Sequence, residues 1–264
     1  MKTSVFMLYV LLLTGGFIAQ ASDTLKIAPC DEAVINLFDD IFTLSRSEGT
    51  LRRYQKGKLL NMYSGSNSAN NIIIQEPVRP VLAGPDKIYL LDAANNRIIA
   101  WDRFLNLHSI TSLHKDIISA SEFTVTSEYD WLIYDDYHQV ILQVFPNENY
   151  PHRWGDFAVS GDIELHRLGQ EVLIYLKERK RVHISDNNGT TLMEYAVPDS
   201  LDVQRIFSLG RNVFGLSCES GIYIWEPQKE MCRYLSNMPE PVFMKRENKV
   251  YTLINRQGLI INIR

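Results

Sequence analysis

Apolar and aromatic residues come in paired runs along this chain. In each pair, one run is followed by a short polar turn and then by a second run. The pairs occupy residues 41–54, 88–102, 131–145, 172–185, 213–226 and 250–264. Their starts are 37 to 47 residues apart, and such a period is typical of the blades of a β-propeller. We therefore predict an all-β, six-bladed β-propeller.

Each pair is expected to form the two middle strands of a four-stranded antiparallel blade. In the clearest repeat, residues 87–92 and 97–102 are β-branched or aromatic strands, and the turn between them is rich in Asn. The near-continuous apolarity of these pairs predicts burial on both faces, as between two neighbouring blades. Trp101, Trp131 and Trp225 are expected to fill that space.

Each pair is preceded by a candidate inner strand and, except in the last repeat, followed by a candidate outer strand. The inner strands are expected at residues 33–38, 78–82, 122–126, 163–168, 203–209 and 242–245, and the outer strands at residues 58–63, 105–112, 150–154, 191–197 and 231–235. Residues 24–28 form a further strand-like run near the N-terminus. We expect this run to complete the sixth blade, because it would cover an otherwise open sheet edge.

Other β architectures fit the pattern less well. A β-sandwich also has short strands and frequent turns, but they do not repeat in groups of about 40 residues. A right-handed β-helix repeats in much shorter units. Propellers of five or seven blades remain alternatives.

The N-terminus has the features of a secretory signal peptide. Lys2 precedes an apolar stretch at residues 5–13, and Ala19-Gln20-Ala21 offers a cleavage site. The stretch is shorter than the ~20 apolar residues of a membrane-spanning helix. We expect residues 1–21 to be removed, so that residues 22–264 form one exported domain without a transmembrane anchor, in the periplasm or outside the cell.

Charge and cysteine content narrow the function classes. A formal charge of −4 and a pI near 5.9 argue against a nucleic-acid-binding protein, which usually has a basic face. The one basic run, residues 177–181, is expected to be a solvated hairpin tip and not an anionic docking patch. Cys218 and Cys232 are predicted on strands separated by a third strand, too far apart for a disulfide. We expect mostly unpaired thiols, with Cys30 as a possible exception.

The second repeat resembles an NHL-type repeat. The similarity is carried by Asp92-Ala93-Ala94-Asn95-Asn96-Arg97-Ile98 followed by Trp101-Asp102. Matches around residues 135–140 and 255–258 are partial or weak. The resemblance implies a six-bladed propeller over most of the mature chain, but it does not imply one chemistry, because NHL-like propellers serve as binding scaffolds and as enzymes.

A binding site is expected at the mouth of the central channel, where the inner strands converge. Counting back from each repeat places the following residues there: Glu32, Arg79, Glu122, Asp162, Gln204 and Glu240, with Asp31 and Asp202 adjacent. This set is predominantly acidic with one arginine. It predicts a site for a cationic group or for calcium, although strand starts at a solvated rim are polar in any case.

An enzyme of the calcium-dependent lactonase type is the alternative. Resemblance to gluconolactonase and paraoxonase propellers would require a Glu, one or two Asn and an Asp in the channel. Glu32 or Glu122 could supply the first and Asp162 or Asp202 the last, whereas Asn36 is the one Asn on an expected inner strand. The histidines lack zinc spacing, and no hydrolase, metalloprotease or phosphate-loop motif occurs.

A second candidate surface lies on an expected outer strand. Tyr150, His152, Arg153 and Trp154 could form an aromatic, Arg-containing patch that anchors a protein. The sequence therefore predicts a non-enzymatic binding or scaffolding module for a protein, peptide or glycan. It requires no cofactor, and calcium belongs to the lactonase alternative.

Overall fold

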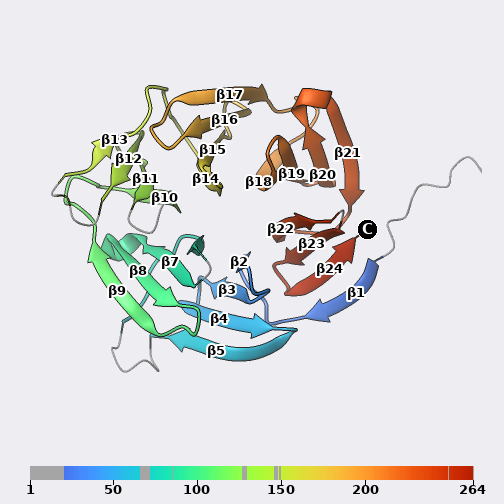
Figure 1. Ribbon diagram of the computed structural model, residues 1–264, viewed down its shortest axis with the longest axis horizontal. Helices are drawn as coiled ribbons and strands as arrows, with labels where there is room; N and C mark the ends of the chain where they lie inside the picture. Colours follow the sequence, from blue (N-terminus) through green and yellow to red (C-terminus); the bar gives the residue numbers. More distant parts are fainter. Residues whose placement is uncertain are drawn as a thin grey trace, which may run out of the picture.

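The protein is a closed ring of six blades around a central axis (Figure 1). The computed structural model describes residues 21–65, 72–84, 86–126, 130–145, 148, 150–248 and 250–263. Within these ranges the chain forms 24 strands and two short 3₁₀ helices, η1 (Ala93–Asn95) and η2 (Pro227–Lys229). Every blade is a four-stranded antiparallel sheet, as the sequence pattern predicts.

The first three blades follow the chain from the inside of the ring to the outside. Blade 1 contains β2 (Glu32–Ile35), β3 (Ile41–Ser45), β4 (Thr50–Gln55) and β5 (Lys58–Ser64). Blade 2 contains β6 (Val81–Ala83), β7 (Lys87–Asp92), β8 (Arg97–Asp102) and β9 (Leu107–Ser112). Blade 3 contains β10 (Ala120–Val125), β11 (Trp131–Asp135), β12 (Val140–Val144) and β13 (His152–Arg153).

The last three blades follow the same order, except that the sixth takes its outer strand from the N-terminus. Blade 4 contains β14 (Ile163–Leu168), β15 (Glu171–Leu176), β16 (Arg181–Asp186) and β17 (Thr191–Ala196). Blade 5 contains β18 (Val203–Gly210), β19 (Val213–Cys218), β20 (Gly221–Glu226) and β21 (Met231–Ser236). Blade 6 contains β22 (Pro241–Glu247), β23 (Val250–Asn255), β24 (Leu259–Ile263) and β1 (Ala21–Lys26).

The N-terminal strand closes the ring. β1 pairs antiparallel with β24, and Leu25 lies opposite Ile260. Beyond the strand, the backbone N–H of Ile27 donates a hydrogen bond to the carbonyl of Gly258 at 2.9 Å. The inner strands β2 and β22 are also in contact, and Figure 1 shows β1 alongside β24. The prediction that the two ends of the chain share one blade is therefore confirmed.

The hydrophobic core consists of six layers, each between two consecutive blades. Trp101 is fully buried between blades 1 and 2, where its ring lies edge-on to that of Tyr63 with 5.1 Å between the centroids. Trp131 and Trp225 occupy the layers between blades 2 and 3 and between blades 4 and 5. Middle strands are mainly apolar because both faces meet another blade.

Several strand ends differ from the sequence expectation, for local reasons. β2 ends at Ile35 and not at residue 38, because the Asn36 side-chain oxygen accepts hydrogen bonds from the backbone N–H groups of Phe38 and Asp40. β9 begins only at Leu107, because the Asp102 carboxylate accepts two backbone N–H groups of the preceding turn. β6 begins after Pro80, which has no N–H to donate.

The aspartates of the NHL-like motif hold the blade together. Asp92 is fully buried and accepts a hydrogen bond from the Arg97 side chain at 2.8 Å and one from the backbone N–H of Gln75 at 2.9 Å. Asp102 caps the turn between β8 and β9. The motif therefore organises turns on blade 2, and its residues lie outside the lining of the channel mouth described below.

A buried ion cluster links blades 1 and 2. Asp40 is completely buried and lies 3.0 Å from the Arg53 guanidinium and 2.9 Å from that of Arg103. Arg103 also stacks over Phe38, with 4.1 Å to the ring centroid. One carboxylate thus pairs with two cations, which makes the cluster dependent on that carboxylate.

The three cysteines are unpaired. Cys218 lies on β19 and Cys232 on β21, with β20 between them, which confirms the predicted separation. Cys30 and Cys218 are buried, whereas Cys232 is exposed. In the part of the chain that the structure describes, no helix has the length and apolar character needed to cross a bilayer.

Candidate functional site

The mouth of the central channel is a cavity of about 1010 Å³ at the end of the axis where the inner strands begin. All six blades, or the segments leading into them, contribute to its lining. The lining contains six acidic and five basic side chains: Glu32, Glu76, Glu122, Asp136, Asp162 and Glu164, with Arg46, Arg79, Lys177, Arg205 and Arg256. The expectation of a predominantly acidic mouth with one arginine was therefore wrong, because basic residues from neighbouring loops and strands were missed.

Four of the six predicted mouth residues line this cavity, namely Glu32, Arg79, Glu122 and Asp162. The other two, Gln204 and Glu240, do not, nor do the adjacent Asp31 and Asp202. Glu240 instead lies 3.7 Å from Arg256, and the Asp31 carboxylate accepts the backbone N–H of Arg46 at 2.8 Å.

Gln204 was misplaced by a β-bulge. In the pairing of β18 with β19, Val203 lies opposite Cys218 and Arg205 opposite Ser217, so that Gln204 is the extra residue. A bulge shifts the alternation of side chains by one position. Arg205 therefore faces the channel, and Gln204 is exposed outside it.

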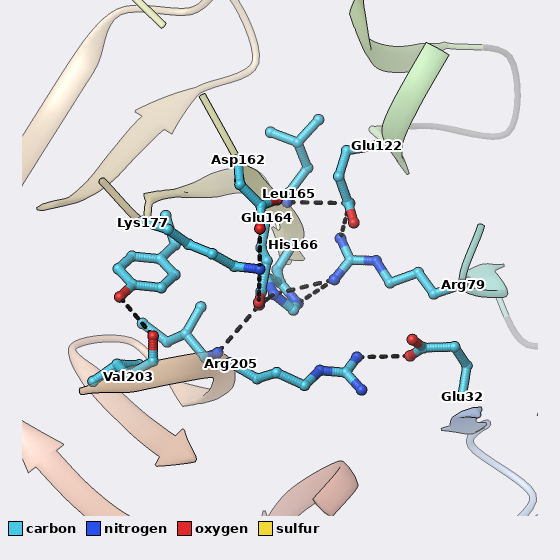
Figure 2. Close-up of polar contacts among 12 residues, drawn as sticks. Glu32, Arg79, Glu122, Asp162, Glu164, Leu165, His166, Lys177, Val203 and Arg205 are labelled. Carbon is cyan, nitrogen blue, oxygen red and sulfur yellow. Dashed lines mark hydrogen bonds and ion pairs between the residues drawn. The ribbon is translucent and has the colours of Figure 1, made fainter. Parts of the chain in front are cut away.

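Arg79 enters the mouth from the segment before β6. Pro77 and Pro80 flank it and restrict the backbone on both sides. Its guanidinium lies 3.2 Å from the Glu122 carboxylate, and its Nη1 lies 3.1 Å from each ring nitrogen of His166 (Figure 2). The nitrogen nearest Glu122 is Nη2, which is buried and whose contact with that carboxylate lacks hydrogen-bond geometry.

β14 places two polar side chains beside this arginine. Glu164 and His166 are two residues apart, so they lie on the same face of the strand. His166 Nε2 lies 3.2 Å from Glu164 Oε2, which also accepts the backbone N–H of Ile206 at 3.1 Å. Leu165, between them in sequence, points into the layer between blades 3 and 4.

Arg205 lies across the channel from Arg79, and it shares its counter-ion Glu32 with Arg46. One oxygen of Glu32 is 2.6 Å from Arg205, and the other oxygen is 2.9 Å from Arg46 (Figure 2). A single carboxylate therefore serves two guanidinium groups. We call the set of Arg79, Arg205 and Glu32 the arginine collar.

Lys177 was predicted to be part of a solvated hairpin tip, and that prediction was wrong. It follows β15 directly and its ammonium group lies 2.7 Å from Asp162 and 3.5 Å from Glu164. Burial opposes its charge, but the carboxylates of Glu164 and Asp162 raise the pKa of Lys177. The rest of the basic run stays on the surface, where Arg181 pairs with Glu194 at 3.2 Å.

The titration behaviour of the inner groups follows from burial and neighbouring charges. Burial raises the pKa of Glu122 to about 7, although Arg79 acts in the opposite direction. Burial and the charge of Arg79 lower the pKa of His166 to about 4. Burial alone would raise the pKa of Glu164, but the hydrogen bond from His166 and the charges of Arg205 and Lys177 hold it at about 2. Near neutral pH, His166 is therefore uncharged and Glu122 is partly protonated.

Below the arginine collar, the channel continues as an apolar cavity, here called the lower chamber. It has a volume of about 240 Å³, and Glu32, Arg79 and Arg205 line both it and the mouth. Its other walls are mainly apolar side chains of the inner strands, among them Val34, Leu82, Phe207, Phe243 and Met244. The polarity of the channel thus changes from charged to apolar at the collar.

The donors expected for a calcium-dependent lactonase do not converge. Asn36 lies beyond the end of β2, where it hydrogen-bonds to its own turn, while Glu32 lies at the start of that strand in the mouth. Asp202 is outside the cavity, and Glu32, Glu122 and Asp162 each face a cation. Within the described ranges, no group of three or more His, Cys, Asp or Glu residues is arranged to hold a metal ion.

The proposed edge patch is smaller than expected. Trp154 is only 3% exposed, packs against Phe157 and donates its indole N–H to the carbonyl of Asn187 at 2.9 Å. It therefore fastens blade 3 to blade 4 and belongs to the core. Tyr150, His152 and Arg153 are exposed, so the surface part of the patch consists of these three.

Comparison with known proteins supports the fold alone. No family model matches the sequence, and no curated protein matches it. The chain is similar in structure to the β-propeller domain of Cps50 (Swd1) from Myceliophteria thermophila, with a TM-score of 0.63 and 10% identity over 92% of this chain and 98% of that one. It is also similar to virginiamycin B lyase from Staphylococcus aureus, with a TM-score of 0.62 and 7% identity over 92% of this chain and 98% of the lyase. A catalytically inactive H270A form of that lyase, with quinupristin, has a TM-score of 0.61 and 8% identity over 91% and 97% of the two chains.

The strand pairing and the structural similarities together define the fold class of the protein. It is a six-bladed β-propeller of four-stranded antiparallel blades, closed by an N-terminal strand.

Proposed function

We propose that this propeller is a binding module that holds a protein segment, peptide or glycan in the mouth of its channel. The observation that carries the proposal is the mouth itself, a cavity of about 1010 Å³ that collects eleven charged side chains from a rigid ring. Concave sites with a few convergent polar groups are the usual places of ligand binding. Both signs of charge are present, so the mouth suits a partner that also carries both.

The proposal includes export and an NHL-like ancestry. Export is supported by the leader-like sequence at residues 1–21, of which residues 1–20 lie outside the described residues. The NHL-like assignment is supported by the motif of blade 2, where Asp92, Arg97 and Asp102 perform the structural roles described above. Propellers of this kind bind partners as well as catalyse reactions, so the assignment is compatible with a scaffold.

A hydrolase or lyase is the second candidate, favoured by one observation. Glu122 lies in the mouth beside Arg79, and burial raises its pKa to about 7, a value suited to a general acid or base. One of the similar structures is described as a lyase. The calcium-dependent lactonase form of this candidate is the less supported one, because its donors do not meet.

Two matched arginines allow a test of the binding proposal. Arg46 lines the mouth with a 51% exposed side chain paired with Glu32, whereas Arg181 lies on blade 4 with a 48% exposed side chain paired with Glu194. Affinity capture from the native cell envelope should recover a partner with the wild-type chain and with Arg181→Glu, but not with Arg46→Glu. Equal capture by the two variants would show that the mouth does not bind the partner.

The enzyme candidate has its own test. Micromolar calcium should leave the melting temperature unchanged, and a panel of lactones should not be hydrolysed. A rise of several degrees together with hydrolysis that is lost in Glu122→Gln would replace the binding proposal by an enzymatic one.

A further inference from the structure

We propose that the arginine collar binds the C-terminal carboxylate of a peptide whose last residue has an apolar side chain, and that this side chain enters the lower chamber. The inference rests on the proposed binding function of the mouth and specifies its ligand. It is built on three features of the channel: the two guanidinium groups at the collar with their shared counter-ions, the incomplete hydrogen bonding of Arg79, and the change of polarity below them.

The counter-ions at the collar are shared or incompletely ionised. Glu32 divides its two oxygens between Arg205 and Arg46. Glu164, whose pKa the charges of Arg205 and Lys177 help to hold at about 2, also faces Lys177 at 3.5 Å. The carboxylate partner of Arg79 is Glu122, which lies 3.2 Å away and is partly protonated near neutral pH, because burial raises its pKa to about 7. Arg79 and Arg205 therefore each lack a fully ionised carboxylate of their own.

The donors for such a charge are in place. Arg79 Nη2 is buried and lies 3.2 Å from Glu122 Oε2, but this ion pair lacks hydrogen-bond geometry. The Arg79 side chain is 11% exposed. Arg205 presents a second guanidinium on the same stretch of the channel (Figure 2). Planar guanidinium groups bind carboxylates with two parallel hydrogen bonds, and a buried donor without a partner is costly. A carboxylate between these two arginines would accept hydrogen bonds from both guanidinium groups and would give Arg79 Nη2 an acceptor.

The lower chamber selects the kind of carboxylate. Its walls beyond the collar are mainly apolar, with Val34, Leu82, Phe207 and Met244 among them; the polar members are Thr124, His166, Arg167 and Ser208. In a C-terminal residue the carboxylate and the side chain branch from one Cα, so one can meet the arginines while the other continues into the chamber. An Asp or Glu side chain ends in its carboxylate and has nothing apolar to place beyond it. An acidic sugar would bring hydroxyl groups into an apolar space, where they lose hydrogen bonds to water.

The rest of the peptide would leave through the mouth. Its backbone and side chains would there meet the mixed charges of the rim, such as Asp136, Asp162 and Arg256. Capture of a terminal carboxylate by a prepared cluster of donors is an established mode of peptide recognition. Here the collar would set the position of the terminus, and the rim would add preferences for preceding residues.

The experiment compares four small probes on the full-length purified protein by isothermal titration calorimetry. The probes are N-acetyl-Gly-Leu with a free carboxylate, the same peptide as its amide, N-acetyl-Gly-Asp amide and glucuronate. We expect the free acid to bind at least ten-fold more tightly than each of the other three, since a lost charge-assisted hydrogen bond costs that much or more.

Variants of the two collar arginines test whether the carboxylate binds at the collar. Arg79→Gln and Arg205→Gln should reduce the affinity for the free acid at least ten-fold and leave the amide unaffected. Arg181→Gln is the matched control, because Arg181 lies outside the mouth with a 48% exposed side chain paired with Glu194, and it should keep the preference for the acid. If a collar variant does not fold, the preference of the wild-type protein still decides the question.

The outcomes separate this inference from the proposed function. Equal binding of acid and amide in the mouth would refute carboxylate capture and leave peptide binding intact. Tighter binding of glucuronate or of the Asp amide would refute the terminal, apolar residue. Absence of binding by every probe would refute the inference, and the proposed function would fall too only if Arg46→Glu also left partner capture unchanged.

Discussion

Replacing Glu122 by Gln should stabilise the protein at neutral and higher pH. Burial raises the pKa of Glu122 from 4.5 to about 7 in the folded protein, whereas an unfolded chain ionises Glu near its ordinary value. Between these two values the unfolded state therefore loses its proton first. Stability falls by about 1.4 kcal/mol per pH unit in that window, which adds up to about 3 kcal/mol above pH 7.

The sign of this effect separates it from ordinary surface electrostatics. Below pH 4.5 both states carry the proton, so Glu122 costs nothing there. Gln has the same shape and never ionises. The variant should match the wild type at pH 4 and exceed it by up to about 3 kcal/mol at pH 8, with most of the gain appearing between pH 5 and 7.

Urea unfolding followed by tryptophan fluorescence at pH 4, 6 and 8 measures this difference. The control is Glu194→Gln on the outer strand β17, where the carboxylate is 45% exposed and pairs with Arg181; it should show no gain at pH 8. If Glu122→Gln is no more stable than the wild type at pH 8, or gains equally at pH 4, then burial does not disfavour the ionised carboxylate of Glu122.

Three further predictions concern the scaffold. Asp40→Ala should cost about 3 to 5 kcal/mol in urea unfolding, because it leaves two arginines without their shared buried carboxylate; a loss below 1 kcal/mol would mean that solvent replaces the carboxylate. Deleting residues 21–26, the strand β1, should expose the edge of β24 and cause concentration-dependent association in light scattering, whereas a stable monomer would show that the ring closes without it. Ellman's reagent should label Cys232 in the native protein and the other two cysteines only after unfolding, and labelling of all three in the native state would contradict the burial described here.

The arrangement of strands could be predicted because it follows from local sequence. Alternating runs and turns at a regular spacing define each blade, and the strand left over at residues 24–28 had one free edge to join. The predicted bounds were wrong at strand ends, where the hydrogen bonds of a single side chain can end a strand. The Asn36 side chain ends β2 by accepting the N–H groups of the next turn, an interaction that apolar periodicity does not reveal.

The site was harder to predict, because its members come from distant parts of the chain. Counting from each repeat found Glu32, Arg79, Glu122 and Asp162, but it selected Gln204 in place of Arg205. The bulge in β18 that exchanges these two is a feature of strand pairing. Glu164 and His166 had a visible signal, since they alternate with apolar residues on an inner strand. Lys177 had none, because a charged run is normally solvated.

The sequence by itself determined the ring. Apolar runs that recur about every 40 residues can be buried only between neighbouring copies of the repeat. The number of blades and the covering of the last sheet edge therefore follow from the order of residues. The tertiary structure decided the character of the channel. Whether Arg79, Arg205, Glu32 and Glu122 neutralise one another depends on bulges, on burial and on separations of about 3 Å between segments more than 40 residues apart. Electrostatic energy depends on distance and desolvation, and neither quantity is encoded in the local pattern of the chain.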